Sequence, residues 1–316
     1  MSLSSAPSLP SAPSLPSSPE PTLPPTHRGP DRRALVLGGG GSTGNAWLIG
    51  VVAGLAGAGV DVATADLTVG TSAGATATAQ LAGRPAAELL AAVLAARPPA
   101  GAGAATARPV ADQLDRPRGI IAVAHDQADL RRRLGAAALE RAAAADGSWP
   151  ARWRATVEAR LPDTRWPDRA VLITAVDARS GEPAVFDRHS GVDLVDAVAA
   201  SCASGLPYPI GGRWYLDGGY RANAENADLA AGCGRILVLS PFGGRSLTPP
   251  EWGTRLAAQV DALRAGGSRV ETIGPAAEDE HLFGSNAMDL SLRPAAARAG
   301  RRRGRAVAAS LAGLWH

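Results

Sequence analysis

The sequence predicts an α/β fold in which a mostly parallel sheet is flanked by helices. Two units of strand, glycine-rich turn and helix follow one another, at residues 34–57 and 67–81. Further apolar strands are expected at residues 170–174 and 236–239, with a helical stretch between them. Strands that alternate with helices in this way are typical of a parallel sheet, because each crossover places a helix on one of its faces.

The chain has 316 residues, of which 46% are hydrophobic, as expected for a folded globular protein. Residues 1–31 are rich in Ser and Pro and contain a directly repeated hexapeptide. We therefore expect a disordered tail there and one folded domain over residues 32–316. Residues 84–165 are rich in Ala and Arg, are interrupted by Pro and show no clear strand. They are expected to form a helical insert, a candidate lid over the site.

Composition excludes several functions. A formal net charge of +3 is too small to predict a nucleic-acid partner, and without any Lys the chain cannot form a Walker-type phosphate loop. No apolar run reaches the roughly 20 residues of a membrane span. The chain start resembles no secretory signal, so a cytoplasmic location is expected. Cys202 and Cys233 are too few for a disulfide framework and are expected to be small buried residues.

The first strand–turn–helix unit contains a cluster of glycines. Residues 34–37 form a short apolar strand, Gly38 to Gly41 follow it with Gly44, and apolar residues then recur at helical spacing. Consecutive glycines allow successive backbone N–H groups to face one point. Such a loop suits the stabilisation of an oxyanion.

The same loop admits a second interpretation. Gly39, Gly41 and Gly44 satisfy the G-x-G-x-x-G pattern of a dinucleotide-binding loop. In that case Asp61 or Asp66, roughly 20 residues further on, would bind the ribose. The glycine loop by itself leaves both interpretations open.

The second unit turns at Gly70-Thr71-Ser72-Ala73-Gly74, which matches a nucleophile elbow. A serine at a sharp strand-to-helix corner has strained backbone geometry, and its neighbours two residues away must be small so that strand and helix can approach. The N-terminus of the following helix favours developing negative charge. The motif and its context predict Ser72 as a nucleophile.

Asp217-Gly218-Gly219 follows a short strand at residues 214–216. A carboxylate on such a tight corner could accept the proton of a serine hydroxyl directly. A lone Asp-Gly-Gly is more typical of an ordinary turn.

Taken together, the glycine loop, G-T-S-A-G and D-G-G, in this order, resemble the motifs of the patatin-like phospholipase family. Further similarities lie at residues 45–55, 174–186 and 200–209 and at Asn223. The resemblance extends over about residues 33–240, is faint at residues 84–165 and is only generic beyond residue 245. It implies a three-layer α/β/α fold.

The resemblance also implies a chemistry. Ser72 would attack an acyl carbonyl, and Asp217 would take its proton as the general base of a catalytic dyad. The backbone amides of Gly39, Gly40 and Gly41 would hold the oxyanion, and water would then cleave the acyl-enzyme. The implied substrates are phospholipids or simpler acyl esters, and neither a metal nor a cofactor is implied.

Two residues, Thr43 and His281, support alternatives to a hydrolase with a Ser–Asp dyad. The family often has Arg or Lys where Thr43 stands, which puts rate and substrate preference in doubt. Thr43 is also the sequence support for a catalytically idle lipid-binding protein of the same fold. His281 lies where the order of a Ser–Asp–His triad would place its histidine, which makes a triad esterase the other alternative.

Tryptophans and arginines are interleaved at residues 149–166. Such a segment could contact a lipid surface at the membrane periphery, since indoles favour the interface and Arg favours anionic headgroups. The preferred interpretation is that the tryptophans pack against the domain with Arg on the exposed side. The sequence leaves the oligomeric state open.

Overall fold

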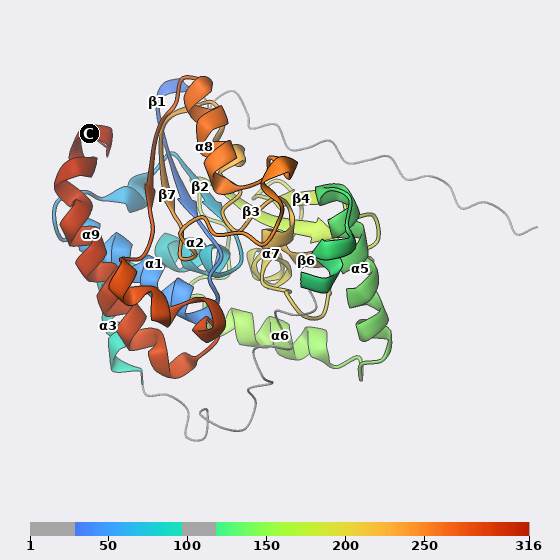
Figure 1. Ribbon diagram of the computed structural model, residues 1–316. Helices are drawn as coiled ribbons and strands as arrows, with labels where there is room; N and C mark the ends of the chain where they lie inside the picture. Colours follow the sequence, from blue (N-terminus) through green and yellow to red (C-terminus); the bar gives the residue numbers. More distant parts are fainter. Residues whose placement is uncertain (1–28, 97–117, 316) are drawn as a thin grey trace, which may run out of the picture.

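In the computed structural model, residues 29–96 and 118–315 are described, and they form one mixed sheet with helices on both faces (Figure 1). The strands are β1 (Gly29–Leu37), β2 (Leu67–Gly70), β3 (Ala170–Asp177), β4 (Pro183–Phe186), β5 (Tyr208–Ile210), β6 (Arg213–Asp217), β7 (Cys233–Leu239) and β8 (Arg269–Ile273). Their order in the sheet is β5-β6-β3-β2-β1-β7-β8, with β4 paired to β3.

The strands β3, β2, β1, β7 and β8 run parallel to one another, whereas the pairings of β4, β5 and β6 are antiparallel. β1 pairs in parallel with β2 and β7, β2 with β3, and β7 with β8. β4 and β6 both run antiparallel to β3, and β5 runs antiparallel to β6. The register brings two corners together across β3, since Gly70 at the end of β2 pairs with Ile173 and Asp217 at the end of β6 pairs with Ala175.

The helices form the two outer layers. They are α1 (Gly41–Ala56), α2 (Ala73–Gly83), α3 (Ala86–Ala95), α5 (Gln127–Ala143), α6 (Trp149–Glu158), α7 (Leu194–Ser201), α8 (Leu256–Ala265) and α9 (Arg293–Trp315). Alternate residues of a strand face opposite sides of a sheet. Accordingly, Leu35 and Leu37 of β1 pack with α1, α3 and α9, whereas Ala34 and Val36 belong to the core that α8 covers. The expected three-layer α/β/α architecture is confirmed.

The chain differs from the sequence expectations at its ends. β1 already begins at Gly29, because Gly29 pairs with Cys233 of β7, so the first strand overlaps the last residues of the expected tail. Residues 1–28 lie outside the described part. α8 and β8 were not expected, and short 3₁₀ turns lie between residues 277 and 292 before α9 begins.

The insert expected at residues 84–165 packs on the domain in separate places. α3 joins the layer of α1 and α9 through Leu89, Leu90 and Val93. α5 covers β6 and the end of β3, and α6 packs on α7. Residues 97–117 lie outside the described part, and the lid therefore stays a prediction. Among the described residues, no helix combines the length and the apolar character that crossing a bilayer requires.

Candidate active site

Ser72 occupies the turn between β2 and α2 in a backbone conformation that residues with side chains rarely adopt. Its φ angle is 52°, a conformation that costs about 1–3 kcal/mol and persists only where the surrounding structure holds it. The turn also requires a glycine two residues later, since a Cβ on Gly74 would lie 1.8 Å from the carbonyl oxygen of Leu37. Helix α2 thus packs directly against the end of β1, and Ser72 stands half-buried at its N-terminus.

Asp217, the last residue of β6, lies beside this serine. The Ser72 hydroxyl donates a hydrogen bond of 2.8 Å to Oδ2 of Asp217. The Gly219 N–H donates a second bond of 2.8 Å to Oδ1. Gly218 lets this corner approach β3, because a Cβ there would lie 2.0 Å from Oγ1 of Thr174. Each carboxylate oxygen therefore accepts one hydrogen bond, and the one on Oδ2 comes from the serine.

The Asp217 carboxyl group is buried. Burial raises its pKa from the ordinary value of 3.8 to about 6, although the hydrogen bonds from Gly219 and Ser72 act in the opposite direction. A carboxylate with this pKa is still mostly ionised at pH 7 and is a stronger proton acceptor than an exposed aspartate. Geometry and pKa together suit a general base for the serine hydroxyl.

The end of α7 fixes the backbone of the serine, a role that the sequence did not reveal. The Ser72 N–H donates to Oγ of Ser201 at 2.9 Å, and the Ser72 carbonyl oxygen accepts a bond of 3.2 Å from the Cys202 thiol. Burial, supported by the negative charge of Asp217, raises the pKa of Cys202 to about 12 and keeps the thiol a donor. The only sequence signal for these contacts was the family resemblance of residues 200–209.

The glycine loop after β1 lies next to Ser72, since a Cβ on Gly39 would be 3.6 Å from the serine Cβ. The Gly39 N–H donates to the carbonyl oxygen of Ala224 at 2.7 Å, so this amide is not free to hold an oxyanion, contrary to expectation. No partner is found among the described residues for the N–H groups of Gly40 and Gly41. Gly41 has a φ of 64° and begins α1. Two candidate donors therefore remain, at the positive end of a helix dipole.

Thr43 stands where the resembled family often has a positively charged residue. A guanidinium group from another part of the chain contacts the first turn of α1, which contains Thr43. Thr43 is buried, and its N–H donates to the carbonyl oxygen of Ala287 at 3.0 Å. Arg293, the first residue of α9, donates to the carbonyl oxygen of Ser42 at 2.8 Å and to Oδ1 of Asn45 at 3.2 Å. A positive charge thus lies at the first turn of α1 although Thr43 does not supply it.

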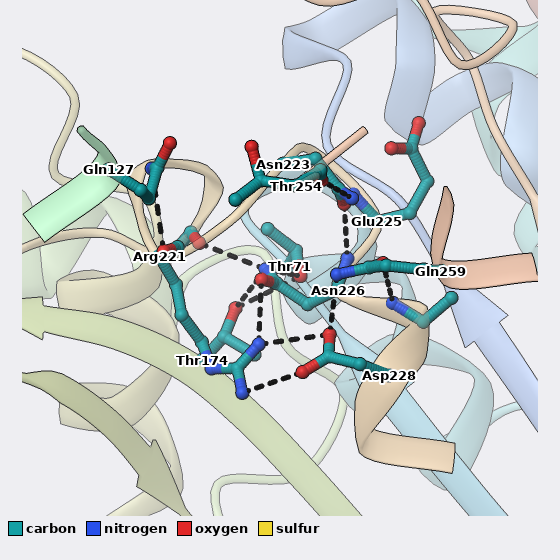
Figure 2. Close-up of polar contacts among 12 residues, drawn as sticks. Thr71, Gln127, Thr174, Arg221, Asn223, Glu225, Asn226, Asp228, Thr254 and Gln259 are labelled. Atoms are coloured by element: carbon teal, nitrogen blue, oxygen red, sulfur yellow. Dashed lines mark hydrogen bonds and ion pairs between the residues drawn. The ribbon is translucent and has the colours of Figure 1, made fainter. Parts of the chain in front are cut away.

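Figure 2 shows a buried polar network centred on Asn226. The Asn226 side-chain amide donates to Oγ1 of Thr71 at 3.0 Å and to the carbonyl oxygen of Gly218 at 2.9 Å. Thr71 immediately precedes the serine and Gly218 immediately follows the aspartate. One amide group therefore connects the two corners that carry the candidate catalytic side chains.

Further residues hold Asn226 in place. Its backbone has a φ of 55°, and its N–H donates to Oδ1 of Asn223 at 2.7 Å. Buried Arg221 donates to Oδ1 of Asn226 at 3.3 Å and forms an ion pair of 2.8 Å with Asp228. Gln259 also donates to Asp228. Asn223 carried part of the family resemblance, whereas Asn226 had no signal in the sequence.

We expect Asn226→Ala to lower kcat about tenfold to a hundredfold and to destabilise the fold by about 2–3 kcal/mol. It removes the buried side-chain hydrogen bonds to Thr71, Gly218 and Arg221 and places Ala in a left-handed conformation. Steady-state kinetics on an acyl ester and thermal denaturation measure the two effects. Asn226→Gly is the matched control, because it removes the amide without the backbone strain and should lose a similar part of kcat. Full activity in Asn226→Gly would show that the amide does not position the site.

The alternative with a Ser–Asp–His triad finds no support at His281. This residue is exposed in the 3₁₀ turn of residues 277–282, where Nδ1 lies 2.9 Å from the carbonyl oxygen of Glu278. The Ser72 hydroxyl meets the carboxylate of Asp217 instead. Among the described residues, no group of three or more His, Cys, Asp or Glu side chains could hold a metal ion.

The dinucleotide alternative fails on the position of its acidic residues. Asp61 accepts from the N–H of Ala63 and caps the turn at residues 62–64. Asp66 precedes β2 and pairs with Arg32 of β1 at 2.9 Å. Both carboxylates therefore lie at the end of the sheet where β1 and β2 begin, opposite the glycine loop that follows β1.

The tryptophans of residues 149–166 are half-buried, and each indole N–H donates to a backbone carbonyl oxygen of the domain. The bonds run from Trp149 to Pro207 at 3.3 Å, from Trp153 to Ala199 at 2.9 Å and from Trp166 to Val192 at 2.7 Å. This arrangement fits the preferred interpretation that they pack against the domain. Contact with a membrane surface stays a prediction.

A strained serine beside a buried carboxylate, at a corner of an α/β sheet, places this chain in the class of α/β proteins with a candidate serine hydrolase site. A family model described as patatin-like phospholipase matches residues 35–229. The chain therefore belongs to the patatin-like phospholipase family, and membership implies a lipid acyl hydrolase.

Solved structures and curated sequences were also compared with the chain. It is similar to VipD from Legionella pneumophila, with 13% identity and a TM-score of 0.40 over 90% of this chain and 68% of that one. It is also similar to the type III effector protein ExoU, with 16% identity and a TM-score of 0.39 over 90% of this chain and 54% of that one. No curated protein sequence matches the chain significantly.

Proposed function

We propose that this protein is a serine acyl hydrolase that cleaves carboxylic ester bonds of acyl lipids or simpler esters through a Ser72–Asp217 dyad. The observation that carries the proposal is the hydrogen bond of 2.8 Å from the serine hydroxyl to the buried carboxylate. Nucleophile and base are then within reach of one another without an intervening histidine. The family and the strained turn at Ser72 support the same assignment.

In the first half of the reaction, Ser72 Oγ attacks the carbonyl carbon of the ester while its proton passes to Oδ2 of Asp217. The carbonyl oxygen becomes an oxyanion, for which the N–H groups of Gly40 and Gly41 are the proposed donors. One such donor is worth roughly 3 kcal/mol of the barrier. The protonated Asp217 then gives its proton to the departing alkoxide, which leaves an acyl group on Ser72.

The second half regenerates the enzyme. Asp217, again ionised, takes a proton from water as the water attacks the acyl carbonyl. Collapse of the second tetrahedral intermediate releases the carboxylic acid, and the proton on Asp217 returns to Ser72 Oγ. Asp217 thus acts as base and acid in turn, which a pKa of about 6 permits near neutral pH.

The proposal is tested with an alkyl fluorophosphonate, which modifies activated serines. We expect the folded protein to gain one phosphonyl group on the peptide that contains Ser72, as located by mass spectrometry. Ser72→Ala and heat-denatured protein serve as controls and should remain unmodified. An unmodified Ser72 in folded protein, or a label on another serine, would contradict the proposal.

The pH dependence follows from the pKa of Asp217. The base must be ionised, so kcat/KM is expected to fall about tenfold for each pH unit below about 6 and to level off above it. A pH–rate profile with a soluble acyl ester measures this. Glu225 is a second buried carboxyl group with a raised pKa, so Glu225→Gln is the matched control. Loss of the acidic limb in that variant would assign the titration to Glu225 instead.

A further inference from the structure

Glu225 is a buried carboxyl group that takes no part in the proposed reaction. The residue is 1% exposed, and it belongs to no ion pair among the described residues. Burial raises the pKa of Glu225, although a hydrogen bond from the Ser240 hydroxyl acts in the opposite direction. A buried carboxyl group destabilises a fold unless hydrogen bonds compensate for its lost hydration. The bond from Ser240 therefore contributes to holding this carboxyl group in place.

The Ser240 hydroxyl connects Glu225 to the end of β7. Ser240 is buried directly after this strand, and its Oγ donates to Oε1 of Glu225 at 2.5 Å. The same Oγ accepts a bond of 2.8 Å from the N–H of Gly244. A serine hydroxyl has a single proton to donate. Because that proton goes to Glu225 while a lone pair accepts from Gly244, the two bonds together fix the orientation of the hydroxyl.

The chain segment that contains Glu225 contacts the glycine loop directly. The Gly39 N–H donates to the carbonyl oxygen of Ala224 at 2.7 Å. A Cβ on Gly38 would lie 3.2 Å from Cγ of Glu225. The Glu225 N–H donates in turn to Oδ1 of Asn223 at 2.8 Å (Figure 2). Gly38 and Gly39 therefore pack on a segment that is fixed through both the backbone and the side chain of Glu225.

Residues 239–241 contact the same loop. The Gly38 N–H donates to the carbonyl oxygen of Leu239 at 3.0 Å. Pro241 lies against Gly40, since a Cβ on Gly40 would be 2.6 Å from Cβ of Pro241. The end of β7 therefore supports both the first and the third glycine of the loop.

The glycine loop thus contacts two chain segments that one buried hydrogen bond joins. We propose that the hydrogen bond from Ser240 to Glu225 positions the glycine loop for oxyanion binding, which makes both of them positioning residues. An oxyanion donor is effective only within hydrogen-bond distance of the place where the oxyanion forms. The N–H groups of Gly40 and Gly41, the proposed donors, therefore depend on a fixed loop. The proposal rests on the proposed hydrolase function and adds two residues to it.

The first test removes this hydrogen bond from either end. Ser240→Ala removes the donor, and Glu225→Met removes the acceptor but keeps a side chain of similar length. Each is expected to lower kcat about tenfold with little change in KM, because a displaced loop weakens contacts made in the transition state. Glu225→Gln keeps an oxygen that can accept from Ser240, and it should recover most of the lost kcat. The double variant should lose no more than either single variant, since both remove the same bond.

Ser268→Ala is the matched control. It also removes a buried serine hydroxyl, which donates to the carbonyl oxygen of Cys233 at the opposite end of β7. Its kcat should equal that of the wild type. An alkyl trifluoromethyl ketone, which adds to an activated serine as a tetrahedral oxyanion, gives a second measurement. Its inhibition constant should rise about tenfold in Ser240→Ala and stay unchanged in Ser268→Ala.

Hydrogen exchange tests the same bond without any substrate. The peptide with residues 38–44 is expected to exchange at least about fivefold faster in Ser240→Ala than in the wild type or Ser268→Ala, because the bonded N–H groups of Gly38 and Gly39 would open more often. Faster exchange beside an inactive wild type would contradict the hydrolase proposal and support the role of Ser240 in fixing the loop. Wild-type exchange in Ser240→Ala, or an unchanged kcat in both folded single variants, would overturn that role.

Discussion

Ser72→Ala is expected to lower kcat for acyl-ester hydrolysis at least about 10⁴-fold. Without Oγ no acyl-enzyme forms, and what remains is the catalysis that substrate binding and the oxyanion donors supply to direct attack by water. The Cβ of Ala fits where that of Ser already lies, and the turn at φ 52° is retained. The fall in kcat therefore reflects the missing nucleophile and not a change in the fold. Turnover of a chromogenic short-chain ester measures it.

Ser310→Ala is the matched control for this loss. Ser310 lies on the exposed side of α9, and its hydroxyl donates to the carbonyl oxygen of Val307. Its replacement should leave turnover within about twofold of the wild type, with the same melting temperature. If Ser72→Ala retained more than about a tenth of the wild-type kcat while folded, another nucleophile would have to carry the reaction.

The sequence predicted those parts of the site that local patterns specify. G-T-S-A-G requires small residues at positions 70 and 74, and the close approach of Gly74 to Leu37 shows why. D-G-G requires Gly218 for a similar reason, because Thr174 leaves no space for a side chain. The residues that must be small at a tight turn are close to one another in the sequence. They therefore form a motif that can be recognised without the structure.

Residues whose role depends on a distant contact could not be predicted. Asn226 bonds to Thr71, which is 155 positions away in the sequence, and to Gly218, which is 8 positions away. The residues around Asn226 form no motif. The hydrogen bond from the Gly39 N–H to the carbonyl oxygen of Ala224 forms because the chain after β6 passes beside the glycine loop. A run of glycines indicates that several backbone N–H groups could face the site. It does not show which of these N–H groups are already hydrogen-bonded within the folded protein.

The same distinction applies to the fold. β1 and β7 are central strands buried on both faces, and their apolar runs are visible in sequence. β8 is an edge strand with the sequence Arg-Val-Glu-Thr-Ile, of which only Val270 and Ile273 are buried. An edge strand buries little and pairs on one side, and so its sequence contains few apolar residues. Its place beside β7 follows from tertiary pairing.

The largest effect after loss of the nucleophile is expected for Asp217→Asn, which should lower kcat about 10³-fold to 10⁴-fold. Asn has the shape of Asp and can accept the bond from the Gly219 N–H, but it cannot take the proton of Ser72. The same variant is expected to be more stable than the wild type at pH 8, since it replaces a buried charge with a neutral group.

The sign of this stability change follows from the raised pKa. In the unfolded chain Asp217 ionises with the ordinary pKa of 3.8, and in the fold it does so at about 6. Its protonated form therefore favours folding below about pH 4, and this contribution is lost as the pH rises through about 6. Above that pH, the ionised group costs up to about 3 kcal/mol that Asn does not incur.

Thermal denaturation of both proteins at pH 8 and pH 5 measures this difference. At pH 8 the melting temperature of Asp217→Asn should exceed that of the wild type by several degrees, and at pH 5 the gap should shrink because the wild-type carboxyl group is then largely protonated. Asp217→Ala is the matched control, because it loses activity equally but also leaves the Gly219 N–H without its acceptor. A less stable Asp217→Asn at pH 8, or one that retains wild-type kcat, would show that the fold does not hold a buried, ionised base beside Ser72.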